Sequence, residues 1–134
     1  MVALTAVLDA WAVMALYEAH PCVEDVEAAI DEGEAVMCSV NLGEVLYTLE
    51  RDHGTERSAG LVERARSVIA VEDPDWDLVV RAARVKAGGG LSYADAFCVA
   101  TAQRHDAPLY TGDPEILALG DVVELVDLRA ESAR

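Results

Sequence analysis

Three acidic residues in this sequence stand alone inside apolar segments. Asp9 is the single charge in MVALTAVLDAWAVMALY, Glu44 in AVMCSVNLGEVLYTL and Asp95 in LSYADAFCVATAQ. A carboxylate in such surroundings is costly to remove from water unless a partner compensates its charge. A fourth acid, Asp113, follows the apolar run APLY and shares its neighbourhood only with Glu115. Carboxylate oxygens are hard ligands, so these four acids could together hold Mg²⁺ or Mn²⁺.

The segments around these acids alternate between β-prone and helical patterns. Strands are expected at 5–8, 35–40, 68–71, 108–110 and 122–126, and helices at 10–19, 23–31, 42–51, 58–66, 74–86 and 92–105. This alternation predicts an α/β fold with a parallel sheet of about five strands and helices on both faces, in three α/β/α layers. No linker or internal repeat interrupts it, so a single domain over residues 1–134 is expected.

The acids fall at corresponding places in these elements. Asp9 and Asp113 each follow an expected strand, and Glu44 and Asp95 are expected in the first turn of a helix. In a parallel α/β sheet, strand C-termini and helix N-termini share one edge, where such folds place their sites. Four carboxylates at that edge repel one another without a cation, so the pattern predicts a divalent metal site.

Helix capping is the alternative role for each acid taken singly. SVNLGE and LSYAD have the spacing of capping boxes that begin at Asn41 and Ser92, and Asp113 precedes Pro114 as a helix cap often does. Asp9 could cap the helix that it precedes. Capping does not explain why all four acids lie at one edge with so little other charge nearby.

Four segments also resemble a known family. In order, VLDAWAVMAL, SVNLGEVLYTL, LSYADAFCVATA and LYTGDPEI resemble the acidic motifs of PIN-domain nucleases, and especially the VapC-like toxins of toxin–antitoxin pairs. The resemblance covers about residues 7–117. It places the family's acidic quartet on Asp9, Glu44, Asp95 and Asp113.

The resemblance implies a metal-dependent endoribonuclease that hydrolyses RNA with a metal-activated water, using Mg²⁺ or Mn²⁺. Three of the quartet are expected as ligands, and Glu44 either binds through water or orients the attacking water. Thr111 matches a hydroxyl position beside the last acid, Glu115 is a possible accessory, and Lys86 falls where such toxins carry a basic residue. One or two metal ions, and RNA or DNA as substrate, remain open.

The resemblance also implies partners, namely a cognate antitoxin and a second copy of the chain in a homodimer. The first helix supplies a physical reason for the antitoxin, because Trp11, Met14 and Tyr17 point to different faces. An exposed share of these side chains would form a patch for a partner helix.

One departure from the family pattern keeps a second function open. The family usually has Ser or Thr one or two residues after the first acid, where this chain has Ala10 and Trp11. A catalytically inactive PIN-like binding module is therefore the alternative. An aspartyl phosphatase is disfavoured, because it would need a second Asp at the position of Trp11.

The charge balance is unusual for a protein that binds nucleic acid. The formal net charge is −15, and Lys86 is the only lysine. Phosphate binding normally relies on Lys and Arg. We expect the acidic surface to be an adaptation to a salt-rich cytoplasm, as in a halophile, because molar salt screens the self-repulsion. The alternative is a mesophilic protein whose base composition replaced lysine with arginine.

The remaining composition indicates a soluble cytoplasmic protein. Apolar runs end well short of the ~20 residues of a membrane span, and no basic segment precedes an apolar one as in a signal peptide. Cys22, Cys38 and Cys98 lack metal-ligand spacing and are expected to be reduced, buried thiols. His20, His53 and His105 are widely separated, which disfavours a zinc site.

Overall fold

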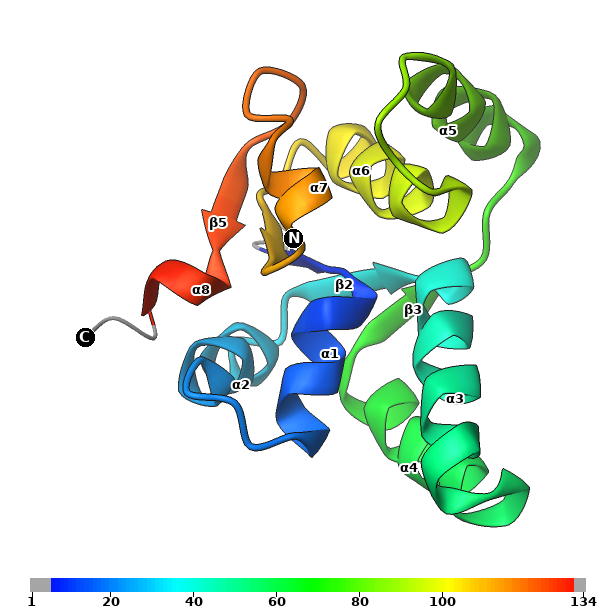
Figure 1. Ribbon diagram of the computed structural model, residues 1–134, viewed down its shortest axis with the longest axis vertical. Helices are drawn as coiled ribbons and strands as arrows, with labels where there is room; N and C mark the ends of the chain where they lie inside the picture. The colour runs from blue at the N-terminus through cyan, green and yellow to red at the C-terminus, as the bar shows by residue number, and fades with distance from the viewer. Residues whose placement is uncertain (1–5, 132–134) are drawn as a thin grey trace.

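A computed structural model describes residues 6–131, and the structural statements below refer to this part of the chain. Five strands alternate with eight helices. The strands are β1 (Ala6–Leu8), β2 (Ala35–Cys38), β3 (Ala70–Glu72), β4 (Leu109–Thr111) and β5 (Leu125–Asp127). The helices are α1 (Ala10–Tyr17), α2 (Val23–Asp31), α3 (Ser39–His53), α4 (Thr55–Val68), α5 (Trp76–Ala87), α6 (Tyr93–His105), α7 (Pro114–Leu117) and α8 (Leu128–Glu131) (Figure 1).

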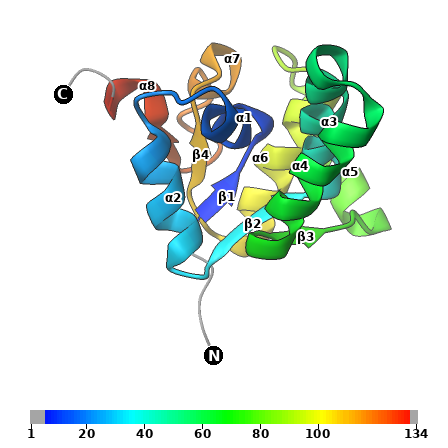
Figure 2. The same ribbon diagram turned by 90° about the horizontal axis from the view of Figure 1, so that it is seen from below.

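The five strands form one sheet in the order β3-β2-β1-β4-β5, and every neighbouring pair is parallel. Figure 2 shows β4, β1, β2 and β3 following one another across the sheet. Val7 of β1 lies opposite Val36 of β2 on one side and Leu109 of β4 on the other. All three are fully buried, as expected for central strands covered on both faces.

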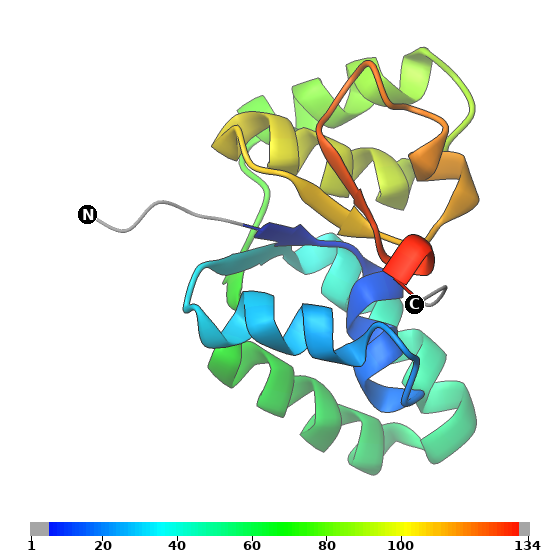
Figure 3. The ribbon, with the colours of Figure 1, turned by 90° about the vertical axis from the view of Figure 1, so that its left-hand side faces the viewer.

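Helices cover both faces of the sheet, so the three-layer α/β/α prediction is confirmed. In Figure 3, the blue to green helices α1–α4 lie on one side and α5, α6 and α7 on the other. The first layer packs on Leu8, Met37 and other residues that face it, and the second packs on Val7 and Val36. Alternate residues of each strand thus serve opposite cores, as the pleat requires.

Several element boundaries differ from the sequence prediction. Thr5, expected in the first strand, lies outside the described residues. The second strand ends at Cys38 and α3 begins at Ser39, three residues before the expected start, so Asn41 lies inside the helix and is not its cap. Helix α4 extends to Val68, which was expected in the third strand, and α5 is capped by Asp75 instead of beginning at Pro74.

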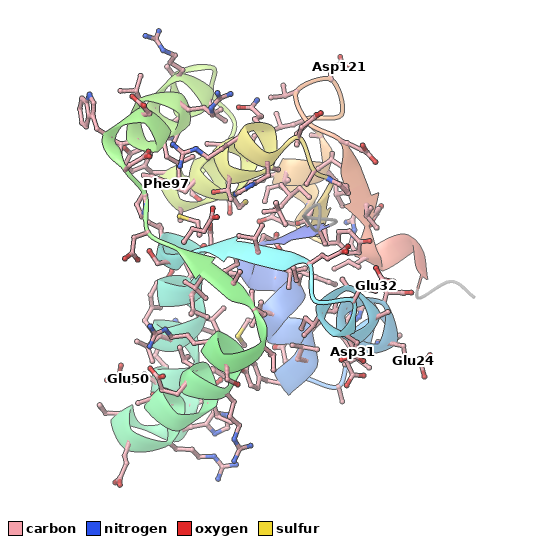
Figure 4. All side chains as sticks on the ribbon, turned by 180° about the vertical axis from the view of Figure 1, so that it is seen from behind. Glu24, Asp31, Glu32, Glu50, Phe97 and Asp121 are labelled. Atoms are coloured by element: carbon pink, nitrogen blue, oxygen red, sulfur yellow. The ribbon has the colours of Figure 1, made fainter. Side chains whose placement is uncertain are left out.

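The three cysteines are buried as expected, and acidic side chains lie on the surface of the fold. Cys22, Cys38 and Cys98 are free and buried. Figure 4 shows acidic side chains pointing outward from several elements, among them Glu24 and Asp31 of α2, Glu32 directly after it, Glu50 of α3 and Asp121 of the loop before β5. None of the described helices is both long and apolar enough to traverse a membrane.

Candidate functional site

The two central strands β1 and β4 deliver the first and last acids of the predicted quartet. Asp9 directly follows β1, and Asp113 lies two residues beyond the end of β4. The chain moves from β1 to β2 in one direction and reaches β4 in the other, so the strand order reverses between β1 and β4. Ligand sites of parallel α/β sheets form at the carboxyl ends of strands beside such a reversal.

Asp9 is held by two hydrogen bonds, one local and one to a neighbouring strand. As the N-cap of α1, its Oδ1 accepts from the Ala12 backbone N–H at 2.8 Å. Its Oδ2 accepts from the Thr111 hydroxyl at the end of β4. Only 3 % of Asp9 is exposed, and Thr111 is fully buried.

Thr111 therefore connects two acids of the quartet. While its hydroxyl donates to Asp9, the same oxygen accepts from the Asp113 backbone N–H at 2.9 Å. The hydroxyl that the family usually places just after the first acid is absent from Ala10 and Trp11. The hydroxyl that orients the Asp9 carboxylate in this structure is that of Thr111, the position that the family resemblance places beside the last acid.

Glu44 comes to the same edge from the second turn of α3, because that helix begins at Ser39. The expectation that Glu44 lies in the first turn is wrong for this reason. Asn41, one turn earlier, is fully buried and donates from Nδ2 to Glu44 Oε1 at 3.1 Å and to the Ala94 carbonyl at 2.8 Å. Asn41 thus connects the start of α3 with the start of α6, a role that the sequence did not reveal.

Asp95 lies in the first turn of α6, as predicted. Ser92 is the N-cap, and its hydroxyl accepts from the Asp95 backbone N–H at 3.1 Å. Asp113 likewise caps α7, accepting from the Glu115 backbone N–H at 2.9 Å, with Pro114 in the first turn. The carboxylates of Asp9 and Asp113 therefore do cap helices, whereas Asp95 and Glu44 lie inside theirs, and all four are gathered at one edge.

One cleft of about 390 Å³ brings the four acids together. It is lined by Asp9, Ala10, Trp11, Met14, Glu18, Glu44, Thr48, Asp95 and Asp113. Glu18, at the end of α1, is a fifth acid that sequence reasoning missed, because a charged residue at a helix end carries no distinguishing signal. Among the described residues that line the cleft, none is basic.

Burial and mutual repulsion raise the proton affinity of three cleft acids. Burial, together with the smaller effect of the nearby charges of Asp113 and Asp95, raises the pKa of Asp9 to about 7, against the lowering effect of its hydrogen bonds to Thr111 and Ala12. The pKa of Asp95 rises to about 6, through burial and then the charge of Asp113. Burial also raises the pKa of Glu44, opposed by the Asn41 hydrogen bond. Uncompensated negative charge in a cleft is the condition that a bound cation relieves.

The spacing of the acids fits a divalent cation. One carboxylate oxygen each from Asp95, Asp113 and Glu115 lies within 4.8 Å of the others. Ligands about 2.1 Å from a central Mg²⁺ lie roughly 3–4 Å apart, so small side-chain rotations bring these three into range. Asp9 is not part of this closest triad, but each of its oxygens retains a second lone pair beyond the hydrogen bond that it accepts.

Trp11 fixes the loop that carries Asp113. A Cβ atom at Gly112 would come within 2.4 Å of the Trp11 ring, so the indole lies directly against the glycine backbone. The other side of the indole meets His20 edge-on, with ring centroids 4.8 Å apart. The residue that departs from the family pattern is thus fitted to the glycine between Thr111 and Asp113.

Lys86 does not line the acidic cleft. It lies in the last turn of α5, and its Nζ donates to the Leu91 carbonyl at 2.7 Å. The loop that it binds leads into Ser92 and α6, so Lys86 is near the edge that carries Asp95. A contact between Lys86 and substrate stays a prediction.

The chain belongs to the PIN domain family, whose model matches residues 6–122. No curated protein matches the sequence closely enough to count as a relative. The family assignment confirms the resemblance seen in the four acidic motifs.

Several solved structures with this fold are VapC, VapBC or toxin–antitoxin proteins by their descriptions. A DNA-bound VapBC from Salmonella typhimurium matches with a TM-score of 0.77 at 17 % identity, over 93 % of this chain and 98 % of that one. VapC20 of Mycobacterium tuberculosis, described as a sarcin–ricin loop cleaving toxin, matches with a TM-score of 0.73 at 22 % identity, over 87 % and 95 %. A toxin–antitoxin complex from Klebsiella pneumoniae gives 0.71 at 19 %, over 92 % and 98 %. The fold is therefore VapC-like.

Proposed function

We propose that this chain is a metal-dependent endoribonuclease, and the toxin of a toxin–antitoxin pair. The observation that supports this most strongly is the convergence of Asp9, Glu44, Asp95 and Asp113 on one cleft without a basic residue among its described lining. Only Asp9 and Asp113 cap helices, so capping does not explain why four carboxylates share one cleft. Phosphodiester hydrolysis with a divalent ion requires such a group of oxygens.

The roles of the residues follow from their contacts. Asp9, Asp95 and Asp113 would hold the ion, and Glu115 offers a further oxygen beside Asp95 and Asp113. When bound, Mg²⁺ or Mn²⁺ supplies an activated water and neutralises negative charge on the phosphate. Thr111 keeps the Asp9 carboxylate in place through the hydroxyl bond described above.

Glu44 is placed to orient the attacking water. Its Oε1 is fixed by Asn41, while the second oxygen carries no hydrogen bond among the described residues and is left to accept one from water. The missing hydroxyl after Asp9 was the argument for an inactive binding module. Asp9 is nevertheless oriented by the Thr111 hydroxyl, and the presence of all four acids in one cleft disfavours the inactive alternative.

The proposed activity is tested with a mixed single-stranded RNA pool, Mg²⁺ or Mn²⁺, and EDTA as the metal-free condition. The parent chain is expected to cleave only with metal, and Asp95→Asn, which can still receive the Ser92 cap, is expected to lose cleavage. Asp77→Asn is the matched control, because Asp77 is an exposed acid in the first turn of α5. Full activity of Asp95→Asn, or cleavage of DNA in preference to RNA, would contradict the assignment.

We further propose that the antitoxin docks beside α1, α2 and α4. Trp11, Met14 and Tyr17 are each partly exposed, as the predicted patch requires, but they open onto two different hollows, since Trp11 and Met14 line the acidic cleft. Tyr17 instead lines a separate groove of about 470 Å³ with Leu16, Val23, Ile30, Val68 and Ile69. An apolar groove between helices suits the apolar face of a partner helix.

Val68 gives the test of this docking site, because it is 56 % exposed at the groove. The chain is co-expressed with the protein encoded next to it, and Val68→Asp is expected to abolish co-purification. Val122→Asp is the control, since Val122 is 45 % exposed on the opposite layer. Loss of the partner in both variants, or in neither, would refute this docking site. The expected homodimer is measured on the same samples by light scattering.

A further inference from the structure

The positive charges of the α5 region stand out in this acidic chain. Helix α5 carries Arg81, Arg84 and Lys86 against one acid, Asp77. Arg81 and Arg84 are three residues apart, so they share a face of the helix. Both are exposed, and neither pairs with a carboxylate in the described part of the chain.

These two arginines line a groove of about 440 Å³. Its other walls come from the turn after α5, from Gln103 on α6, and from Leu119 and Val122 in the segment between α7 and β5. Figure 1 shows α5 and the loop after α7 on either side of α6. The groove therefore combines two guanidinium groups with an apolar wall.

This groove differs from other hollows of the molecule in the charge of its lining residues. No carboxylate is among its lining residues in the described chain. Four other hollows each contain at least one acid, and the cleft of the candidate site contains five. In a chain of net charge −15, an acid-free groove with two unpaired arginines is complementary to a polyanion.

Two helices connect the groove with the acidic cleft. Helix α6 has Asp95 of the cleft in its first turn and Gln103 of the groove eight residues later, about 12 Å along the axis. Helix α7 is capped by Asp113 of the cleft and ends just before Leu119 of the groove. Helices α6 and α7 thus run from the acidic cleft toward the groove that the two arginines line.

We infer that this groove binds the single-stranded RNA that flanks the cleaved bond, an inference that rests on the proposed nuclease function. Arg81 and Arg84 contact the backbone phosphates, because guanidinium groups pair with phosphate oxygens in a bidentate manner. Leu119 and Val122 contact the face of an unstacked base. This subsite supplies the attraction that an acidic cleft alone cannot give to a polyanion.

The test measures binding apart from cleavage. Fluorescence anisotropy follows a labelled 16-nucleotide single-stranded RNA of mixed sequence in Mn²⁺, with every protein in the Asp95→Asn background so that the probe stays intact. Arg81→Gln/Arg84→Gln is compared with Arg57→Gln/Arg66→Gln, which removes the same charge from α4 on the other layer of the fold. Thermal melting verifies that both double variants are folded.

The expected result is a change in salt dependence. Each phosphate contact to a single strand contributes about 0.7 to the slope of log affinity against log salt, so losing two contacts lowers the slope by about 1.4. Between 50 and 200 mM salt, the unsubstituted chain then loses about sevenfold more affinity than Arg81→Gln/Arg84→Gln. The α4 pair is expected to keep the full slope.

Three outcomes would overturn the inference. The first is an equal change in the salt dependence of RNA affinity in the two double variants. The second is no RNA binding by any protein. The third is loss of antitoxin capture in Arg81→Gln/Arg84→Gln with RNA binding unchanged. Cleavage of the RNA pool by the parent chain is measured separately. If that cleavage is present, the groove assignment has failed and the nuclease function stands; if it is absent, the nuclease function has failed as well.

Discussion

Replacing Asp9 with asparagine is expected to stabilise the metal-free protein at neutral and alkaline pH. Asp9 is 3 % exposed, and burial raises its pKa to about 7 despite two hydrogen bonds. Ionised Asp9 therefore costs folding free energy when no cation is bound. Asp9→Asn removes the charge and retains an oxygen to accept from the Ala12 N–H.

The sign and size of this effect follow from the pKa shift. A carboxyl whose pKa is raised in the folded state adds stability at pH values below its unfolded pKa and loses that stability as pH rises through the folded pKa. For Asp9 the window runs from about pH 4 to just above pH 7, and the shift of about 3 pH units corresponds to roughly 4 kcal/mol. Such a change is a large fraction of the 5–15 kcal/mol by which domains are typically stable.

Urea unfolding in EDTA at several pH values measures the effect. Relative to Asp9→Asn, the parent chain is expected to lose roughly 4 kcal/mol more between pH 4 and pH 8. Asp77→Asn controls for the general loss of one negative charge and is expected to follow the parent. Mn²⁺ at pH 8 is expected to raise the free energy of unfolding of the parent chain and to leave that of Asp9→Asn unchanged. If the free energy of unfolding changes with pH in the same way in the parent and in Asp9→Asn, burial of the ionised Asp9 does not destabilise the fold, and the prediction is wrong.

Three further predictions use other features of the site and surface. Gly112→Ala, whose Cβ would meet the Trp11 ring at 2.4 Å, is expected to lower stability by about 1–3 kcal/mol in urea unfolding, and Trp11→Leu in the same chain is expected to recover part of the loss. Asn41→Asp replaces an N–H donor with an acceptor facing Glu44 and the Ala94 carbonyl, so it is expected to lower the free energy of unfolding by roughly 2 kcal/mol or more and to weaken cleavage. Normal cleavage by this variant would argue against a role of Asn41 in positioning Glu44. If the acidic surface is a halophilic adaptation, the melting temperature rises markedly from dilute to molar KCl, and a flat or falling curve would exclude it.

The acids of the cleft could be found from sequence because their neighbours are apolar. Asp9, Glu44 and Asp95 were recognisable as lone charges, and the alternation of strand and helix patterns predicted that they share one edge of the sheet. The structure brings all three into one cleft with Asp113. What the sequence could not give is their spacing, which places Glu115 closer to Asp95 and Asp113 than Asp9 lies.

Contacts between elements distant in sequence could not be predicted. Thr111 was identified only by family resemblance, and its bond to Asp9 joins the end of β4 to the residue after β1, 102 positions away. Asn41 was read as a helix cap, because the sequence did not show that α3 starts directly after β2. Arg81 and Arg84 lie in an ordinary amphipathic helix pattern, and only the packing of α5 beside α6 and the loop after α7 shows the groove they line.

The most direct test of the central claim is a crystal structure of the chain soaked in Mn²⁺, with the ion located by its anomalous scattering. We predict a peak in the cleft, in contact with carboxylate oxygens of Asp95 and Asp113 and within reach of Asp9. Crystals of Asp95→Asn grown and soaked in the same way are expected to lose that peak. A cleft without an anomalous peak in the parent chain, or a peak of equal height in Asp95→Asn, would contradict the metal-site account.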